Sequence, residues 1–165
     1  MLDALGYRRA AQFNEWETES ARDDFAFARV ATENDATHAL ALWRDSQTRV
    51  ASHSVVPDRH WRWTSLDETR VREHVHAGEL RIVPRGFSLL LAYEEHDWSG
   101  LTLPALVGDE ETLRALALAA RGEAAYRGYP HLEAQIADHP ATNRALERAG
   151  FTRGGGMFIY EVEIL

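Results

Sequence analysis

The clearest pattern in this sequence is a long apolar stripe between two strand-like segments. Over residues 110–127, apolar side chains recur at spacings of three and four, as on one face of an amphipathic helix: Leu113, Leu116, Ala117, Ala120 and Ala124. The apolar segment LTLPALV (101–107) precedes this helix, and the alternating segment LEAQIA (132–137) follows it. Pro104 requires a bulge or an unpaired position in the first of these strands.

The rest of the chain continues the alternation of strands and helices. Strands are expected over 25–31, 79–84, 87–94 and 157–164, and helices over 32–50, 66–76 and 138–149. Thr32 and Asp35 have the spacing of a helix capping box. Residues 51–65 show no regular period and are interpreted as a loop. The order β-α-α-β-β-β-α-β-α-β-β predicts an α/β fold, a mixed sheet with helices on its faces, formed by one domain over residues 25–165.

Composition excludes several classes of function. The chain has 165 residues, 45% of them apolar, which suits one compact domain. Its net charge of -8 argues against nucleic acid or an anionic membrane as the main partner. It has no lysine, so a Schiff-base lysine is excluded. It has no cysteine, so disulfides, thiolate zinc sites and cysteine nucleophiles are excluded as well.

The N-terminus lacks the apolar core of a signal peptide, and the apolar runs are shorter than a membrane span. These features predict a cytoplasmic protein. No G-x-S-x-G motif is present, so nothing specific indicates a hydrolase.

The two ends of the chain resemble each other. The segments LDALGYRRAAQFNEWETE and LERAGFTRGGGMFIYEVE align without a gap, and five residues of the first, Leu2, Gly6, Arg9, Glu17 and Glu19, are identical to Leu146, Gly150, Arg153, Glu161 and Glu163. We therefore expect residues 1–24 to be the closing segment of a preceding repeat, with a strand at 9–19. That strand would bury Trp16 at a sheet edge, in its own chain or in a homodimer joined through the N-terminal or C-terminal strand.

Two short motifs add to the element order. The segment RALERAGF (144–151) ends a helix before a strand, and Gly128 with Tyr129 forms a turn from helix to strand. Together with the order, these motifs resemble the GNAT (GCN5-related N-acetyltransferase) family of N-acyltransferases, and the repeat resembles the C-terminal half of a tandem GNAT protein. The resemblance covers residues 25–165. It implies transfer of an acyl group from acyl-CoA to an amine.

The cofactor loop departs from the family pattern. The family binds the CoA pyrophosphate on a Q/R-x-x-G-x-G/A loop, because glycines let backbone N–H groups approach the phosphates at a helix N-terminus. The corresponding residues are Gly108, Asp109, Glu110, Glu111, Thr112 and Leu113, so Glu111 and Leu113 occupy the glycine positions. Acidic residues here are expected to complement the helix dipole rather than to chelate a metal ion that would bind phosphate.

The catalytic positions depart as well. The family's general-acid tyrosine corresponds to Leu146, so we assign no catalytic residue. The resemblance places the pantetheine arm of CoA on the backbone of Leu106 and Val107, with acetyl-CoA as a cofactor that the fold itself does not require. Two functions remain open. One is an N-acyltransferase with an atypical CoA loop acting on a small amine, and the other is a non-catalytic GNAT-like half for assembly or ligand recognition.

Other candidate sites are weaker. His74 and His76 are two residues apart on an expected helix and point in different directions, so no metal site is predicted. The cluster Trp61-Arg62-Trp63 has the composition of a pocket for a planar or cationic ligand. The resemblance places the acceptor groove beside Ser52–Thr64, which includes this cluster.

Overall fold

A computed structural model describes residues 7–22, 27–58, 62–95 and 98–162. The main sheet has seven strands in the order β2-β5-β6-β7-β8-β1-β9, and β3 and β4 form a separate two-stranded sheet. The strands are β1 (Tyr7–Glu19), β2 (Arg29–Val30), β3 (Val55–Asp58), β4 (Arg62–Ser65), β5 (Leu80–Val83), β6 (Gly86–Glu95), β7 (Trp98–Val107), β8 (His131–Ala137) and β9 (Thr152–Val162). The helices are α1 (Ala36–Arg44), α2 (Gln47–Ala51), α3 (Glu68–His76), α4 (Glu110–Tyr126) and α5 (Pro140–Arg148), with a 3-10 turn at Glu33–Asp35.

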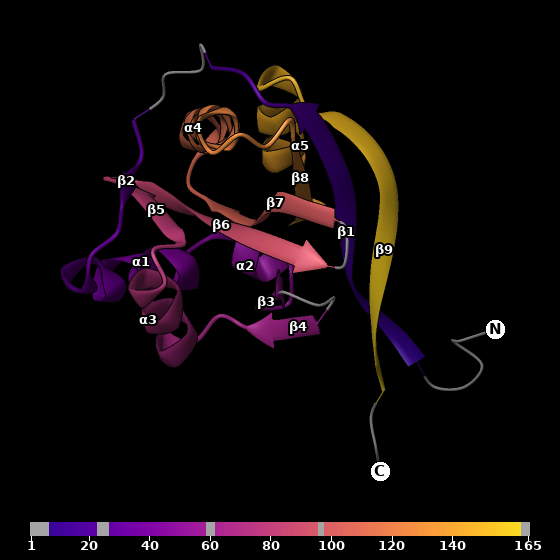
Figure 1. Ribbon diagram of the computed structural model, residues 1–165. Helices are drawn as coiled ribbons and strands as arrows, with labels where there is room; N and C mark the ends of the chain where they lie inside the picture. The colour runs from indigo at the N-terminus through magenta and orange to yellow at the C-terminus, as the bar shows by residue number, and fades with distance from the viewer. Residues whose placement is uncertain (1–6, 23–26, 59–61, 96–97, 163–165) are drawn as a thin grey trace.

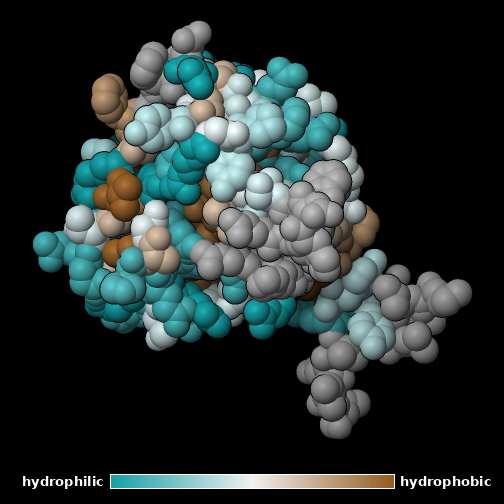
Figure 2. All heavy atoms as spheres, in the orientation of Figure 1, coloured by the Kyte–Doolittle hydropathy of each residue, from teal (hydrophilic) through white to brown (hydrophobic). Residues whose placement is uncertain are grey.

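The helices cover both faces of the main sheet (Figure 1). One apolar cluster lies between the sheet and helices α4 and α5, and the other lies beneath α1 and α3. The apolar stripe predicted for α4 is buried in the first cluster. The outer face shown in Figure 2 is mostly hydrophilic, with small separate hydrophobic spots. The predicted mixed α/β sheet with helices on its faces is therefore confirmed.

The pairing of the strands is antiparallel except between β7 and β8, which α4 connects and which run parallel. No helix of the described residues is long and apolar enough to cross a membrane.

The strand predicted at 9–19 forms as β1, but it does not lie at a sheet edge. β1 is inserted between β8 and β9 and pairs with both. Trp16 is buried in the cluster beneath α4 and α5, with only 2% of its surface exposed. A strand with two neighbours satisfies its backbone groups on both sides, which an edge position would leave half unpaired.

A polar cluster fixes β1 in this place. Asn14 is fully buried, and its Nδ2 donates to Asp138 Oδ1 at 2.8 Å, just beyond the end of β8. Arg153 of β9 donates to Asn14 Oδ1 at 2.7 Å, and Asn143 of α5 donates to Asp138 Oδ1 at 2.7 Å. The cluster therefore joins β1 to β9, to α5 and to the turn between β8 and α5.

Three local expectations need correction. A single strand, β9, follows α5 among the described residues where two were expected, and β1 fills the place beside it. The expected loop at 51–65 contains the β3–β4 hairpin, whose irregular pattern includes Pro57, tolerated because this sheet has only edge strands. Of the strand expected at 25–31, Arg29–Val30 is extended as β2, and 23–26 lie outside the described residues.

The expected helix at 32–50 is also divided. The Ser46 side chain accepts a hydrogen bond from the Arg49 N–H at 3.0 Å and begins a new helix, α2. The break rotates the buried face, so Thr48 is buried, whereas Gln47 and Val50, expected to be buried, are exposed. The capping box at Thr32 is present, because Asp35 Oδ2 accepts from the Thr32 N–H and hydroxyl, each at 2.8 Å.

Candidate functional site

The central strands β7 and β8 separate soon after they meet. They pair only at Thr102 with Glu133 and at Leu103 with Ala134. Pro104 follows directly and has no N–H to continue the ladder. On the other side of β7, the register with β6 shifts so that Leu103 and Pro104 lie opposite one residue, Leu90. The bulge predicted from Pro104 therefore coincides with the point where the two strands diverge.

The short helix α2 lies where β7 and β8 have separated. The Thr48 hydroxyl donates to the Leu106 carbonyl oxygen at 2.7 Å, and both residues are buried. Ala51, on the same helix, packs against Phe13 of β1 and Ala137 of β8. The Leu106 carbonyl, one of the groups that the sequence assigned to the cofactor arm, thus accepts a hydrogen bond within its own chain.

Leu106 and Val107 differ in the direction of their backbone groups. The Leu106 carbonyl points to Thr48, away from β6. In an antiparallel pair, the backbone N–H and C=O groups of successive residues point alternately toward the partner strand and away from it. Val107, opposite Phe87, therefore directs its groups toward β6. Only Leu106 of the two presents its backbone on the side of β8. Thr48 was not predicted from the sequence, because the break before α2 decides which side of that helix is buried.

The residues from Gly108 to Leu113 form the start of α4. The polar side chains of this segment make hydrogen bonds and ion pairs within the chain. Asp109 is the N-cap, and its Oδ1 accepts from the Thr112 N–H at 2.9 Å. Hydrogen bonds from the Thr112 side chain and backbone lower the pKa of the Asp109 carboxyl, which also lies 2.5 Å from Arg85. A Cβ on Gly108 would lie 2.6 Å from the Thr112 methyl group, so this turn is tightly packed. Leu113 is buried.

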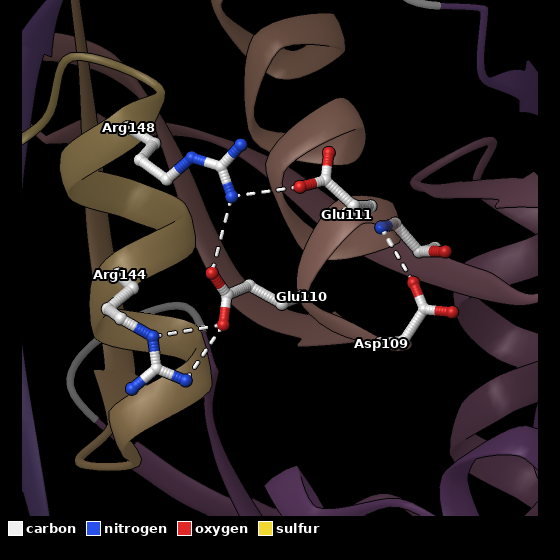
Figure 3. Close-up of polar contacts among 6 residues, drawn as sticks. Asp109, Glu110, Glu111, Arg144 and Arg148 are labelled. Atoms are coloured by element: carbon white, nitrogen blue, oxygen red, sulfur yellow. Dashed lines mark hydrogen bonds and ion pairs between the residues drawn. The ribbon is translucent and has the colours of Figure 1, made fainter.

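The two glutamates of the first turn pair with arginines of α5 (Figure 3). Glu110 Oε2 accepts from Arg144 Nε and a terminal nitrogen at 3.0 and 2.8 Å, and Arg148 lies 3.3 Å from Glu110 Oε1. Arg148 also donates to Glu111 Oε1 at 2.8 Å. The hydrogen bond from Arg144 is the main cause of the lowered pKa of Glu110. The acidic residues thus complement the helix dipole, as expected, and each of the three also contacts an arginine.

These arginines were not identified from the sequence. Arg144 and Arg148 are four residues apart on the exposed side of α5, a spacing that places them on one face of the helix. The spacing shows that the two arginines share one face of α5. It does not identify their acidic partners on α4, which are more than thirty residues away in the sequence.

Leu146, at the position of the family's general acid, is fully buried. It lies in the same apolar cluster as Leu106 and Trp16. The Trp16 Nε1 is buried and has no hydrogen-bond partner among the described residues. No proton donor is therefore provided by the side chain at position 146.

The opposite face of the sheet, away from α4 and α5, carries acidic side chains on neighbouring strands. Tyr93 donates a hydrogen bond to Glu133, and burial, followed by the charge of Glu133, raises the pKa of Tyr93. Glu17 lies directly opposite Glu133, and Glu15 lies opposite Gln135. Since residues alternate along a strand, these side chains share the face of Phe13 rather than that of Trp16. A cationic group would be favoured at this face.

The segment expected to border an acceptor groove lies on that same face. The ring of Trp63 packs on Phe13, with the centroids 4.4 Å apart. Arg62 is exposed, and Trp61 is outside the described residues. The structure thus brings Trp63 to the acidic face of β1, where its ring packs on Phe13, the neighbour of Glu15 on that face.

The histidines considered for metal binding have other surroundings. His74 Nδ1 lies 2.8 Å from Glu79 Oε2, and His76 is exposed. Within the described ranges, no three His, Asp or Glu side chains are grouped as metal ligands would be.

Comparison with known proteins rests on the fold. No known family profile and no curated protein sequence matches the chain. Among solved structures, the protein TTHA1254 of Thermus thermophilus superposes with a TM-score of 0.59 at 19% identity, covering 84% of this chain and 97% of its own. A GCN5-related N-acetyltransferase from Sphaerobacter thermophilus gives 0.57 at 13% identity, covering 96% and 53%. A GNAT-family acetyltransferase from Colwellia psychrerythraea gives 0.60 at 10%, covering 93% and 56%.

The chain spans about half the length of the Sphaerobacter and Colwellia proteins. At these identities the likeness concerns the backbone arrangement alone. The sheet that separates at its centre, the long α4 after β7 and the matching solved structures agree on one conclusion: this chain has the GNAT fold.

Proposed function

We propose that this chain is a non-catalytic GNAT-like domain that serves in assembly or ligand recognition. The observation that carries the proposal is the closed start of α4, where Asp109, Glu110 and Glu111 are held by arginines. A pyrophosphate bound there would have to compete with these carboxylates for the same guanidinium groups. It would also be repelled by any carboxylate that it displaced.

Two further observations support the same function. The Leu106 carbonyl is already hydrogen-bonded to Thr48, and Leu146 offers no proton to a leaving thiolate. A cofactor arm that used the Leu106 backbone would first have to replace an internal hydrogen bond. A buried carbonyl that loses its partner without replacement costs about 1–3 kcal/mol.

A second candidate function is an N-acyltransferase with an atypical mode of acyl-CoA binding. The separation of β7 from β8 after Leu103 favours it, since an extended ligand can pair with a strand that has no neighbour. The carboxylates of Glu17 and Glu133 would attract a cationic amine acceptor on the face that bears Trp63. In this case acetyl-CoA would be the cofactor, held along the backbone of Leu106 rather than by the loop, since Val107 pairs with β6.

Thermal unfolding in the presence of acetyl-CoA separates the two functions. A ligand at 100 times its Kd stabilises the folded state by about 2.7 kcal/mol through mass action. We expect millimolar acetyl-CoA to leave the unfolding midpoint unchanged. ATP serves as the control for non-specific anion binding. A midpoint raised by acetyl-CoA and not by ATP would show that the chain binds the cofactor despite its arginine-paired loop, and release of free CoA when an amine is added would then overturn the non-catalytic function.

We also propose that residues 1–24 derive from the closing segment of a preceding GNAT-like repeat and that they complete the sheet of the one domain that residues 25–165 form. The gapless match between the two ends of the chain supports this origin. So does the fact that the domain uses β1 to fill the place between β8 and β9.

A further inference from the structure

The two edges of the main sheet are very different. β2, at one edge, has two residues, whereas β9, at the other, has eleven. Within the described residues, β9 pairs only with β1 and has no strand on its outer side. Natural edge strands are usually protected by short length, lysine, proline, other charges or bulges. β9 is long and has neither lysine nor proline, and its protection is confined to Arg153, Glu161 and one bulge. The outer edge of β9 is therefore a template for a further strand.

β9 carries three consecutive glycines, Gly154 to Gly156, close to its start. A Cβ on Gly154 would lie 3.6 Å from the Glu15 carbonyl oxygen, and one on Gly156 would lie 3.4 Å from the Phe13 carbonyl oxygen, both ordinary contacts. At Gly155 the nearest atom is the flexible carboxylate end of Glu15. None of the three has positive φ. Gly154 and Gly155 form a bulge opposite Glu15, which accounts for glycine at these two positions, whereas no contact in the chain requires glycine at position 156.

The sequence of β9 is complementary to that of a second β9 strand that runs antiparallel to it. If two copies pair antiparallel with Met157 opposite Met157, the glycine half of each strand lies opposite the bulky half of the other. The pairs are Gly156 with Phe158, Gly155 with Ile159, Gly154 with Tyr160 and Arg153 with Glu161. Each pair occurs twice, and each matches a small residue with a large one or a positive charge with a negative one.

These pairs are favourable ones for a sheet. Aromatic residues across from edge glycines stabilise strand pairing, and so do opposite charges that face each other; within one chain Glu161 also pairs with Arg8, and Arg153 with Asn14. Phe158 and Tyr160 are available for this role, since 45% and 39% of their surfaces are exposed. A bulge in β9 lies at Gly154–Gly155, where the register with β1 shifts, and glycines accommodate such a change of geometry most readily.

The far part of β9 pairs only with β1. β8 pairs with β1 only from Phe13 to Glu19, so residues 7–12 and 158–162 form a two-stranded arm, which packs on the rest of the chain through Ala11 and Ile159. Figure 1 shows β1 and β9 running together past the rest of the sheet. A two-stranded ribbon is marginally stable by itself, and a third strand would support it.

We propose that β9 pairs antiparallel with β9 of a second copy of this chain, about a two-fold axis at Met157. The two seven-stranded sheets then form one continuous sheet. This pairing names the partner for the assembly role proposed above and rests on that role.

A charge on the proposed axis gives a test that separates pairing from folding. Met157→Lys would place two like charges directly opposite each other in the paired strands and should weaken the dimer by at least about tenfold, whereas Met157→Leu keeps an apolar side chain and should leave it unchanged. The thermal stability of the dilute monomer should be similar in the two variants, since Met157 is only partly buried. Sedimentation or light scattering over a concentration series should give twice the mass of 18.7 kDa for the unmodified chain.

The matched control is Tyr126→Ala, which removes an aromatic residue 90% exposed on α4, far in sequence from β9. It should leave the dimer unchanged, whereas Phe158→Ala should weaken it. A monomer at all concentrations, or a dimer that Met157→Lys leaves intact, would overturn the pairing.

A cysteine on the axis tests the register, and the chain has no cysteine of its own. Met157→Cys should form a disulfide between copies under mild oxidation, because facing residues of paired strands lie within disulfide range. Tyr126→Cys should not. A dimer in which Met157→Cys fails to cross-link would show that the register is wrong.

The pairing and the proposed function can fail separately. A monomer that ignores acetyl-CoA would overturn the pairing while the non-catalytic function stands. A dimer whose unfolding midpoint rises with acetyl-CoA and that releases free CoA when an amine is added would overturn the non-catalytic function while the pairing stands.

Discussion

The hydroxyl of Thr48 donates a 2.7 Å hydrogen bond to the carbonyl oxygen of Leu106, two buried residues that are 58 positions apart in the chain. This bond joins α2 to β7 beyond the point where β7 leaves β8. It satisfies a backbone carbonyl that has no neighbouring strand on that side. The backbone carbonyl that the resemblance assigned to the cofactor arm is therefore already hydrogen-bonded within the chain.

Thr48→Val should destabilise the protein. Valine has nearly the shape of threonine but no hydroxyl, so the Leu106 carbonyl would remain buried without its partner. We expect a loss of about 1–3 kcal/mol in the free energy of unfolding, measured by urea denaturation. Thr48→Ser keeps the hydroxyl and is the control. An equal loss in both variants would mean that the methyl group, rather than the hydrogen bond, is responsible.

Trp16→Phe should cost much less than Trp16→Ala. The Trp16 Nε1 has no partner among the described residues, so its removal takes away an unsatisfied donor and leaves only a small cavity. Trp16→Ala empties a site in the cluster under α4 and α5 and should cost about 3–5 kcal/mol. Denaturant titrations of both variants provide the comparison. Similar losses would indicate that a water molecule or another group completes the indole N–H.

The polar cluster at Asp138 should make stability depend on pH in the acid range. Hydrogen bonds from Asn143 and then Asn14, together with the charge of Arg153, lower the pKa of Asp138 below its usual value of about 4. A lowered carboxyl pKa adds stability above the unfolded pKa, and this part is lost as the pH falls through the folded pKa.

Unfolding free energies measured from about pH 6 down to about pH 2.5 should therefore fall less steeply in Asp138→Asn than in the unmodified chain. Asp45→Asn changes an exposed aspartate at the end of α1 and serves as the control. Parallel pH curves for the unmodified chain and Asp138→Asn would contradict the expectation.

Removal of residues 1–24 should abolish cooperative folding. Without β1, the strands β8 and β9 have no pairing partner between them, and the site of the buried Trp16 becomes empty. We expect the shortened chain to lose its sharp thermal transition in circular dichroism. A synthetic peptide of residues 7–19 should restore part of it. A shortened chain that unfolds at the same midpoint would show that β1 is an accessory to the sheet.

Local patterns in the sequence determined much of this protein. The stripe of α4, the strands β5 to β7, the bulge at Pro104 and the acidic first turn of α4 all follow from residue spacing or from single residues. Each depends on interactions within a few positions of the chain. For that reason the predicted α/β class and the GNAT likeness agreed with the structure.

The tertiary structure alone decided the place of β1, the burial of Thr48 and the arginine partners of Glu110 and Glu111. These contacts join residues more than thirty positions apart. The spacing of apolar residues shows which side of a strand or helix is buried. It does not show which other strand will pair with that strand, or which charged side chain will face a given charge. Those choices depend on how the whole sheet satisfies its backbone groups, and β1 satisfies the most by lying between β8 and β9.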